Sequence, residues 1–193
     1  MKKIMLLCTA LMFTSCGIQS LPQQKNEVDA SLAEVTNQYK RRADLIPNLV
    51  NVVKGYATHE KETLEGVVEA RAKATSIQLD PKNATPEKLA EYRKSQGDLS
   101  MALGKLLSIS ENYPNLKADQ NFRELQAQLE GTENRITVAR NRYIVEIKEF
   151  NNLVTVPPTS FTNSMMYHYA QMPQWDVSDA EKTQNEKAPE VKF

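Results

Sequence analysis

Apolar side chains recur at alternating intervals of four and three residues over most of this chain, and this spacing restricts its fold more than any other feature. The first such stripe begins at Val28 and continues to Ala74. An interval that averages three and a half residues keeps one face of a helix turned toward neighbouring helices. Because no segment shows sustained alternation of period two, the pattern predicts helices and argues against a sheet.

Two further stripes of the same kind follow, over residues 89–113 and 122–153. Between the first two stripes, Thr85 has the side chain of a helix N-cap and Pro86 suits the first helical position. Three long helices joined by short loops pack as antiparallel neighbours. The sequence therefore predicts an all-α fold: an elongated antiparallel bundle of three long helices, with a short C-terminal helix and a disordered tail.

Pro47 lies inside the first stripe and leaves two arrangements open. A proline in a helix interior removes a hydrogen bond and costs about 3 kcal/mol. Asp44 could instead cap a new helix that carries Pro47 in its first turn, which would split the stripe and produce a four-helix bundle. Since the stripe keeps its phase across Pro47, we expect one kinked helix over residues 26–77.

The N-terminus has the three parts of a secretory signal. Lys2 and Lys3 precede an apolar run at residues 4–13, and Thr14-Ser15-Cys16 follows. Ten residues of helix reach about 15 Å, roughly half the thickness of the hydrocarbon layer. The segment at residues 13–16 resembles a bacterial lipobox, which predicts a lipid on Cys16. A plainly cleaved signal and an uncleaved membrane anchor are the alternatives.

These patterns divide the chain into five segments. The C-terminal aromatic and Met-rich segment is expected to form a short helix that packs on the bundle, with an adaptable partner-binding surface as the alternative. The segments are a lipoprotein-type signal at 1–15, a spacer at 16–25, the bundle at 26–156, the aromatic and Met-rich segment at 157–176 and a polar tail at 177–193.

Charge and motifs argue against several classes of function. Lys and Arg together number 24, as do Asp and Glu, so no net charge favours nucleic acid. His59 lacks the second histidine four residues later that a zinc helix needs, and His168 is remote in sequence. With Cys16 lipidated and Cys8 removed with the signal there is no thiol nucleophile, and no Gly-x-Ser-x-Gly or phosphate-binding loop is present. We therefore expect that the protein has no enzymatic activity and binds no metal and no cofactor.

Among the polar residues that interrupt the apolar stripes are Arg42, Glu60, Thr132 and Glu146. A buried charge is costly unless it is paired, so each is expected to have a partner or to lie at the margin of its stripe. Their expected role is to fix the register between helices. The alternative is a ligand site in the core near Arg42 or Glu60.

Two long runs resemble the signatures of the LemA family. The first covers residues 39–50 and continues to Glu60, the second covers residues 122–140, and the ending at 188–193 is similar to that family's short Pro-x-Val-x-Phe tail. The resemblance implies a helical bundle behind a membrane anchor, with an undefined activity and no catalytic residues to transfer. Its signature positions are candidates for interaction, with a structural role in holding the helices together as the alternative: Arg41, Arg42, Asp44, Asn48, Glu130, Asn134 and Arg135.

Taken with the N-terminal signal, the resemblance predicts a non-enzymatic scaffold or adaptor of the bacterial cell envelope. We expect it to be tethered to a membrane through a lipid on Cys16, with the bundle outside the cytoplasm and another envelope protein as its partner. The alternative is a helical module of the envelope that binds a small ligand or a peptide.

Overall fold

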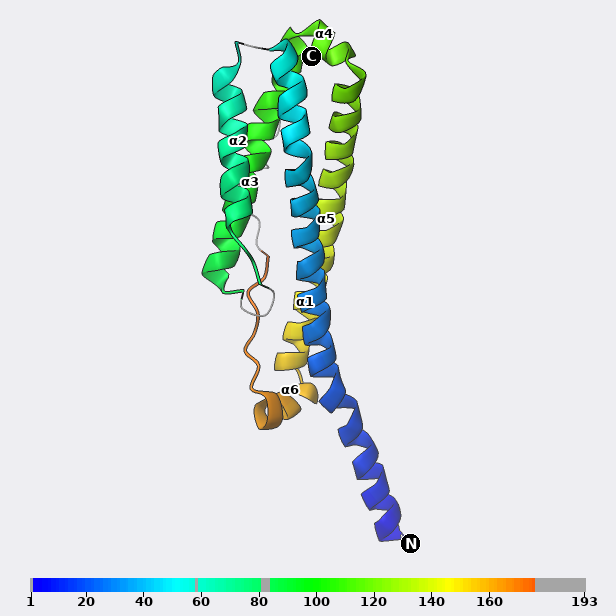
Figure 1. The fold of residues 1–193 in the computed structure, drawn as a ribbon. Helices are drawn as coiled ribbons and strands as arrows, with labels where there is room; N and C mark the ends of the chain where they lie inside the picture. The colour runs from blue at the N-terminus through cyan, green and yellow to red at the C-terminus, as the bar shows by residue number, and fades with distance from the viewer. Residues whose placement is uncertain (1, 58, 81–83, 176–193) are drawn as a thin grey trace, which may run out of the picture. The chain divides into compact units, whose positions relative to one another are not determined.

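The computed structural model describes residues 2–57, 59–80 and 84–175, with side chains from residue 19 onward. Within these residues every regular element is a helix, which confirms the predicted all-α class. None of the described helices is both long and apolar enough to span a bilayer. The elements are α1 (Lys2–Tyr56), α2 (Lys61–Ser76), α3 (Pro86–Ile109), the 3-10 helix η2 (Ser110–Asn112), α4 (Pro114–Ala118), α5 (Gln120–Thr155), α6 (Thr159–Thr162) and the π-helix η3 (Asn163–Tyr167) (Figure 1).

The described chain forms two compact units that share its two longest helices. Unit 1 contains residues 2–35 and 138–175, and unit 2 contains residues 36–137. Both α1 and α5 therefore contribute one section to each unit.

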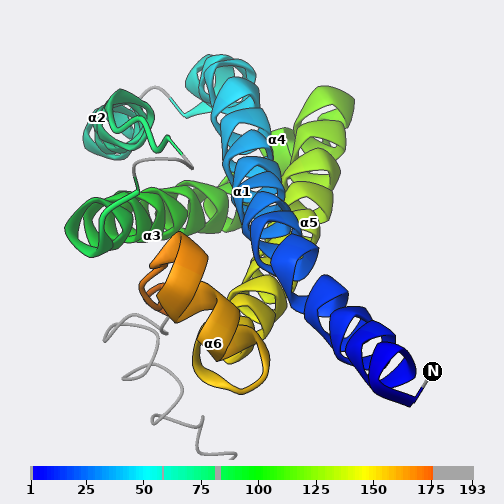
Figure 2. The ribbon, with the colours of Figure 1, turned by 90° about the horizontal axis from the view of Figure 1, so that it is seen from below.

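Unit 2 is built from α2, α3 and one section each of α1 and α5. Helices α2 and α3 lie on one side of α1, and α5 lies on its other side (Figure 2). The apolar stripes predicted from the sequence meet in the core of unit 2, where their side chains lose nearly all contact with water. Its members include Ile46, Leu49, Val53, Val67, Leu99, Leu103, Leu106, Leu116 and Phe122.

The predicted start of α3 is confirmed. Thr85 is its N-cap, and the Thr85 hydroxyl accepts a hydrogen bond from the backbone N–H of Lys88 at 3.3 Å. Pro86 occupies the first helical position, where its missing N–H is not needed. The end of the third predicted helix agrees with its stripe, which finishes at residue 153, because α5 stops at Thr155, ahead of Pro157 and Pro158.

The first stripe differs from its prediction as one helix over residues 26–77. Helix α1 runs through Pro47 unbroken and ends at Tyr56, and the chain reverses before α2 begins at Lys61. In the turn, the backbone N–H of Glu60 donates to the carbonyl of Ala57 at 3.2 Å. The bundle thus has four long helices, but the division lies at residues 57–60 rather than at Pro47.

A hydrogen bond from a neighbouring helix of unit 2 compensates for the presence of Pro47 inside α1. Proline has no N–H, so the carbonyl four residues earlier, on Ala43, has no intrahelical donor. Arg71 of α2 donates its Nε–H to this carbonyl at 2.7 Å. Ala43 is buried, and an unpaired carbonyl there would carry the full desolvation cost of a lost hydrogen bond. A side chain from the neighbouring helix therefore replaces the bond that Pro47 removes.

In unit 1 the first section of α1 packs on the last section of α5. The segment at 16–25, predicted to be a spacer, is helical throughout, and the side chain of Leu21 is fully buried. Gln24 donates its amide N–H to the carboxylate of Glu146 at 2.8 Å. The difference arises because Leu21 continues the spacing of Val28 backward by one heptad, so it belongs to the core face of α1.

After α5, the chain of unit 1 turns through α6 and η3 and returns as an extended segment at 168–175. Two asparagine side chains hold it. Asn163 bonds both the N–H and the carbonyl of Tyr169 at 2.9 Å, and Asn151 does the same for Met172 at 2.8 and 2.9 Å. Part of the predicted Met-rich segment therefore packs, but mainly as extended chain. The predicted tail at 177–193 lies outside the described residues.

Candidate functional site

Arg42 is the centre of the candidate site, because its side chain is 1% exposed in the core of unit 2. One terminal nitrogen of the guanidinium donates to the hydroxyl of Ser100 at 2.7 Å and to the carboxylate of Glu133 at 3.0 Å. The other donates to the backbone carbonyl of Gln96 at 3.1 Å and to its side-chain oxygen at 2.8 Å. One side chain of α1 thus binds both α3 and α5.

The network continues to the fourth helix through Gln96. Its side-chain nitrogen donates to the carbonyl of Ala74 on α2 at 3.2 Å. A continuous chain of hydrogen bonds therefore crosses α2, α3, α1 and α5. Such a layer is satisfied only in one register of the helices, because a shift along any axis would leave buried polar groups unpaired.

Aromatic rings close one side of the network. The guanidinium carbon of Arg42 lies 5.0 Å from the centre of the Tyr39 ring, within reach of a cation–π interaction. Tyr39 in turn packs edge-to-face on Tyr92, with ring centres 5.6 Å apart. Burial raises the pKa of Tyr92 well above its ordinary value of 10.0, so its hydroxyl stays neutral beside the cation.

The electrostatics of the network are asymmetric. Arg42 is buried, whereas the side chain of its ionic partner Glu133 is 51% exposed. The guanidinium donates four hydrogen bonds, and the remaining N–H, on Nε, has no acceptor within the described residues. A guanidinium offers positive charge and hydrogen-bond donors but no acceptor, so its chemistry here is to hold helices together or to bind an anion.

The other polar residues that interrupt the stripes also have partners, as predicted. Glu60 accepts a hydrogen bond from the hydroxyl of Tyr113 at 3.2 Å. Thr132 donates to the carbonyl of Gln128 in its own helix at 2.7 Å. Glu146 lies in unit 1 and accepts the bond from Gln24 described above.

The signature residues separate into one buried and six exposed side chains. Only Arg42 lies in the core. On α1, Arg41, Asp44 and Asn48 are exposed and follow one another at intervals of three and four, so they share one face. The exposed signature residues of α5 are Glu130, Asn134 and Arg135.

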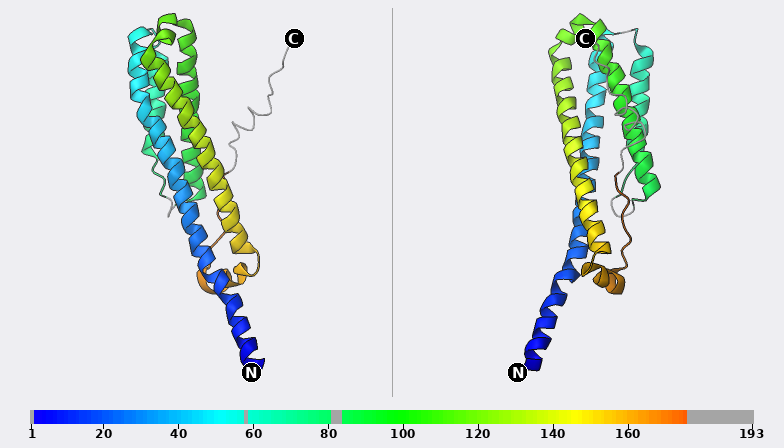
Figure 3. Two further views of the ribbon diagram at one scale, coloured as in Figure 1. Left: turned by 90° about the vertical axis from the view of Figure 1, so that its right-hand side faces the viewer. Right: turned by 180° about the vertical axis from the view of Figure 1, so that it is seen from behind.

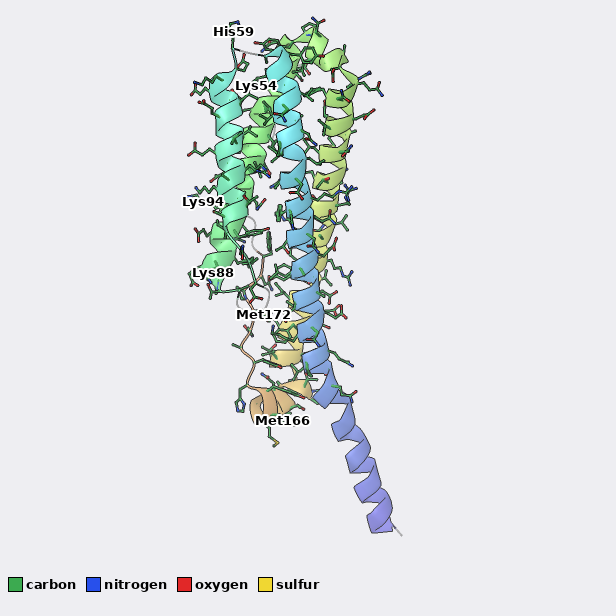
Figure 4. All side chains as sticks on the ribbon, in the orientation of Figure 1. Lys54, His59, Lys88, Lys94, Met166 and Met172 are labelled. Atoms are coloured by element: carbon green, nitrogen blue, oxygen red, sulfur yellow. The ribbon has the colours of Figure 1, made fainter. Side chains whose placement is uncertain are left out.

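A second polar cluster lies at the turn of unit 2 where α4 leads into α5. The carboxylate of Asp119 accepts the backbone N–H of Phe122 and the hydroxyl of Tyr56, each at 2.9 Å. These bonds hold the pKa of Asp119 below its ordinary value of 3.8. His59 is exposed at the same end of the unit, in the turn after α1 rather than within the single helix predicted over residues 26–77 (Figure 4).

Comparison with known proteins identifies the family. A family model described as the LemA family matches residues 31–193. The chain belongs to the LemA family. A curated relative, Protein LemA of Metamycoplasma hominis, is 23% identical over 134 residues, which cover 69% of this chain. The chain spans 58% of the length of that relative. The resemblance inferred from the two signature runs is confirmed.

Sequence reasoning found Arg42 in this LemA-family chain but missed three residues that complete its surroundings. Gln96 interrupts the second apolar stripe, and this polar residue at a core position was the available signal. Ser100 and Arg71 carried no comparable signal, because each stands outside the stripe of its helix. Within the described residues, no group of three or more His, Cys, Asp or Glu side chains could hold a metal ion.

Proposed function

We propose that this LemA-family chain is a membrane-anchored, non-enzymatic scaffold or adaptor of the bacterial cell envelope. In this proposal a lipid on Cys16 holds the chain to the membrane, and the exposed signature faces of α1 and α5 contact another envelope protein. The observation that carries the proposal is that six of the seven signature residues are exposed, whereas only Arg42 serves the core. Exposed polar residues in a family signature suit an intermolecular contact better than a packing role.

The use of Arg42 supports the same proposal. Its four hydrogen bonds go to residues of the chain's own helices. Arg42, the buried residue among the signature positions, therefore holds the helices of unit 2 together. The carboxylates of Glu60 and Glu133 are likewise engaged with side chains of unit 2, those of Tyr113 and Arg42.

A photo-crosslinking experiment in intact cells tests the interaction face. The photoreactive amino acid would replace Asn48 on α1 or Asn134 on α5, both exposed signature positions. The matched control is Lys105, which is exposed on α3 outside the signatures. We expect the same partner band from the first two positions and none from Lys105. Equal patterns from all three positions, or no band from any, would contradict the proposed face.

The anchor has its own test. Mass spectrometry of the protein from the membrane fraction should show an N-terminus at Cys16 that carries acyl chains, because a single chain binds too weakly for stable attachment. A Cys16→Ser variant is the control and should leave the membrane fraction. An intact N-terminus with unmodified Cys16 would remove the lipid anchor from the proposal.

A second candidate function, the binding of a small anion, is favoured by the exposure of Glu133. Because this carboxylate is half exposed, solvent reaches one side of the ion pair with Arg42. A ligand carboxylate that displaced Glu133 would find a positively charged donor already in place. Glu133→Ala tests this idea, since added acetate should restore the thermal stability that the substitution removes. If acetate stabilises the wild type and the variant equally, no such site exists.

A further inference from the structure

The end of unit 1 that contains α6 and η3 is made from a segment without charged side chains. From Phe150 to Trp175 the chain has no Asp, Glu, Lys or Arg, although these residues make up 25% of the whole sequence. At that frequency a run of this length would ordinarily contain about six charges. A surface from which charges are depleted is suited to contact with an apolar environment.

Large apolar side chains are exposed on this segment. Four of them form what we call the basal apolar patch: Val156 (54% exposed), Phe161 (69%), Met165 (82%) and Met166 (53%). Single exposed apolar residues are ordinary, but a group of them on one short turn indicates a contact surface. Figure 4 shows Met166 on the outer side of η3, pointing away from the helices of its unit.

The patch lies close to the N-terminal stretch of α1 within unit 1. The bond between Gln24 and Glu146 sets the antiparallel register of the two helices. From these residues, α1 runs back eight residues to Cys16, about 12 Å, and α5 runs on nine residues to Thr155, about 14 Å. The end of α5 is therefore nearly level with Cys16. Both views of Figure 3 accordingly show α6 beside the place where the N-terminal stretch leaves the unit.

Little chain is available to hold the unit away from a membrane. Leu21 is fully buried in unit 1 and lies only five positions after Cys16. Even fully extended, five residues reach about 17 Å, and as the helix observed here they rise about 7.5 Å. A lipid on Cys16 would thus bring the basal apolar patch down to the bilayer surface.

We infer that the basal apolar patch rests on the membrane and inserts Phe161, Met165 and Met166 at the boundary of head groups and acyl chains. The inference rests on the proposed anchor, because the tether is what brings this end to the lipid. Apolar side chains on a charge-free turn gain by leaving water at this depth, and without basic neighbours the contact needs no anionic lipid. The anchored unit would then have a defined orientation rather than pivoting on its tether.

A lipid crosslinking experiment tests the contact. The full-length protein is reconstituted into phosphatidylethanolamine and phosphatidylglycerol vesicles that contain a phospholipid with a diazirine on its acyl chain. After irradiation, peptides are mapped by mass spectrometry. We expect lipid adducts on the peptide with Phe161–Met166 as well as on the N-terminal peptide. Met101 is the internal control: it is 60% exposed on α3, in unit 2, and should carry none.

Each outcome of this experiment decides between alternatives. Adducts on the N-terminal peptide alone would overturn the inference and leave the anchor standing, whereas adducts on neither peptide would overturn both. Crosslinks from the patch to a second copy or to another protein, without lipid adducts, would also overturn it. The double variant Phe161→Glu/Met165→Glu should lose at least tenfold of the adducts at the patch while keeping those at the N-terminus. Met101→Glu should change neither, and circular dichroism checks that both variants are folded.

Discussion

A buried arginine is unusual enough to need a physical account, because transferring a charge from water to a protein core costs several kcal/mol unless it is compensated. Arg42 meets this requirement through four hydrogen bonds, an adjacent carboxylate and an aromatic face. A hydrophobic residue would fill the same volume without these demands, but it would tolerate more than one register of the surrounding helices. The network therefore contributes specificity of packing as much as stability.

Replacement of Arg42 by Met tests this account. The substitution keeps an apolar stem but leaves the side-chain oxygen of Gln96 without its donor and takes one of two side-chain donors from the Gln96 carbonyl, which still accepts from the Ser100 hydroxyl, and Gln96 is itself buried. We expect a loss of about 3 kcal/mol in the free energy of unfolding, measured by urea denaturation. The control is Arg41→Met at the neighbouring exposed position, which should change stability by less than about 0.5 kcal/mol. Equal stability of the two variants would contradict a fastening role for Arg42.

The bond from Arg71 to the carbonyl of Ala43 predicts a coupling with Pro47. In the wild type, Arg71→Ala leaves a buried carbonyl unpaired, and we expect a cost of about 1–3 kcal/mol. In a Pro47→Ala background the new backbone N–H at position 47 can bond this carbonyl, so the same substitution should cost at least about 1 kcal/mol less. Urea unfolding of the four proteins in the double-mutant cycle measures the difference.

The control for this cycle is Lys73→Ala. Lys73 is on the same helix as Arg71, and its side chain is 60% exposed. Its substitution should cost the same in both backgrounds. Additivity of Arg71→Ala and Pro47→Ala would show that the arginine does not substitute for the missing helical bond.

At the scale of the helix, Asp119 makes the start of α5 sensitive to acid. Its carboxylate accepts the N–H of Phe122, and its pKa in the folded protein lies below 3.8 because the ionised form is hydrogen-bonded. A depressed pKa adds stability that is fully present above the unfolded value and disappears as the pH falls through the folded value. Asn can occupy the same capping position without titrating.

We therefore expect the wild type to be more stable than Asp119→Asn at pH 6, and the difference to vanish as the pH is lowered from about 4 toward 2. Urea unfolding at a series of pH values measures this, and NMR titration of the carboxylate reports its pKa directly. A difference that stays constant with pH, or a measured pKa at or above 3.8, would show that the hydrogen bonds do not favour the ionised form.

The positions of helices and caps were predictable because they depend on neighbours in sequence. The apolar stripes located the core, and Thr85 with Pro86 located the start of α3. The turn at residues 57–60 was not predictable in the same way. The spacing of apolar residues continues unchanged through the turn. Two helices joined by a turn at this point bury the same residues as one continuous helix would. Only tertiary contacts distinguish the two, such as the bond of Gln96 on α3 to α2 and that of Tyr113 to Glu60.

At the scale of the whole molecule, the two units differ in how their polar side chains are used. Unit 2 contains the network of Arg42, which depends on residues distant in sequence. Its position could be suspected from one charge in an apolar stripe, but its partners could not, because Gln96 and Ser100 reach Arg42 only through the packing of separate helices. Unit 1 contains a charge-free segment whose fold depends on side-chain bonds to the backbone rather than on periodicity, and this is why the sequence indicated only a short helix there.

That segment has a built-in reporter, since Trp175 is the only tryptophan of the chain. It is 5% exposed and packs edge-to-face on Tyr143, whose pKa is raised to about 12 by burial. Asn151→Ala removes both bonds to Met172, worth about 2 kcal/mol together, so the undocked form of the segment should become about 30-fold more populated. Acrylamide should then quench Trp175 more strongly and its emission should move to longer wavelength, whereas the control Asn152→Ala, at an exposed neighbouring position, should change neither. If Asn151→Ala leaves the fluorescence unchanged, the segment is held by Trp175 and its aromatic neighbours alone, and the asparagine bonds are not what keeps this end of the chain on the bundle.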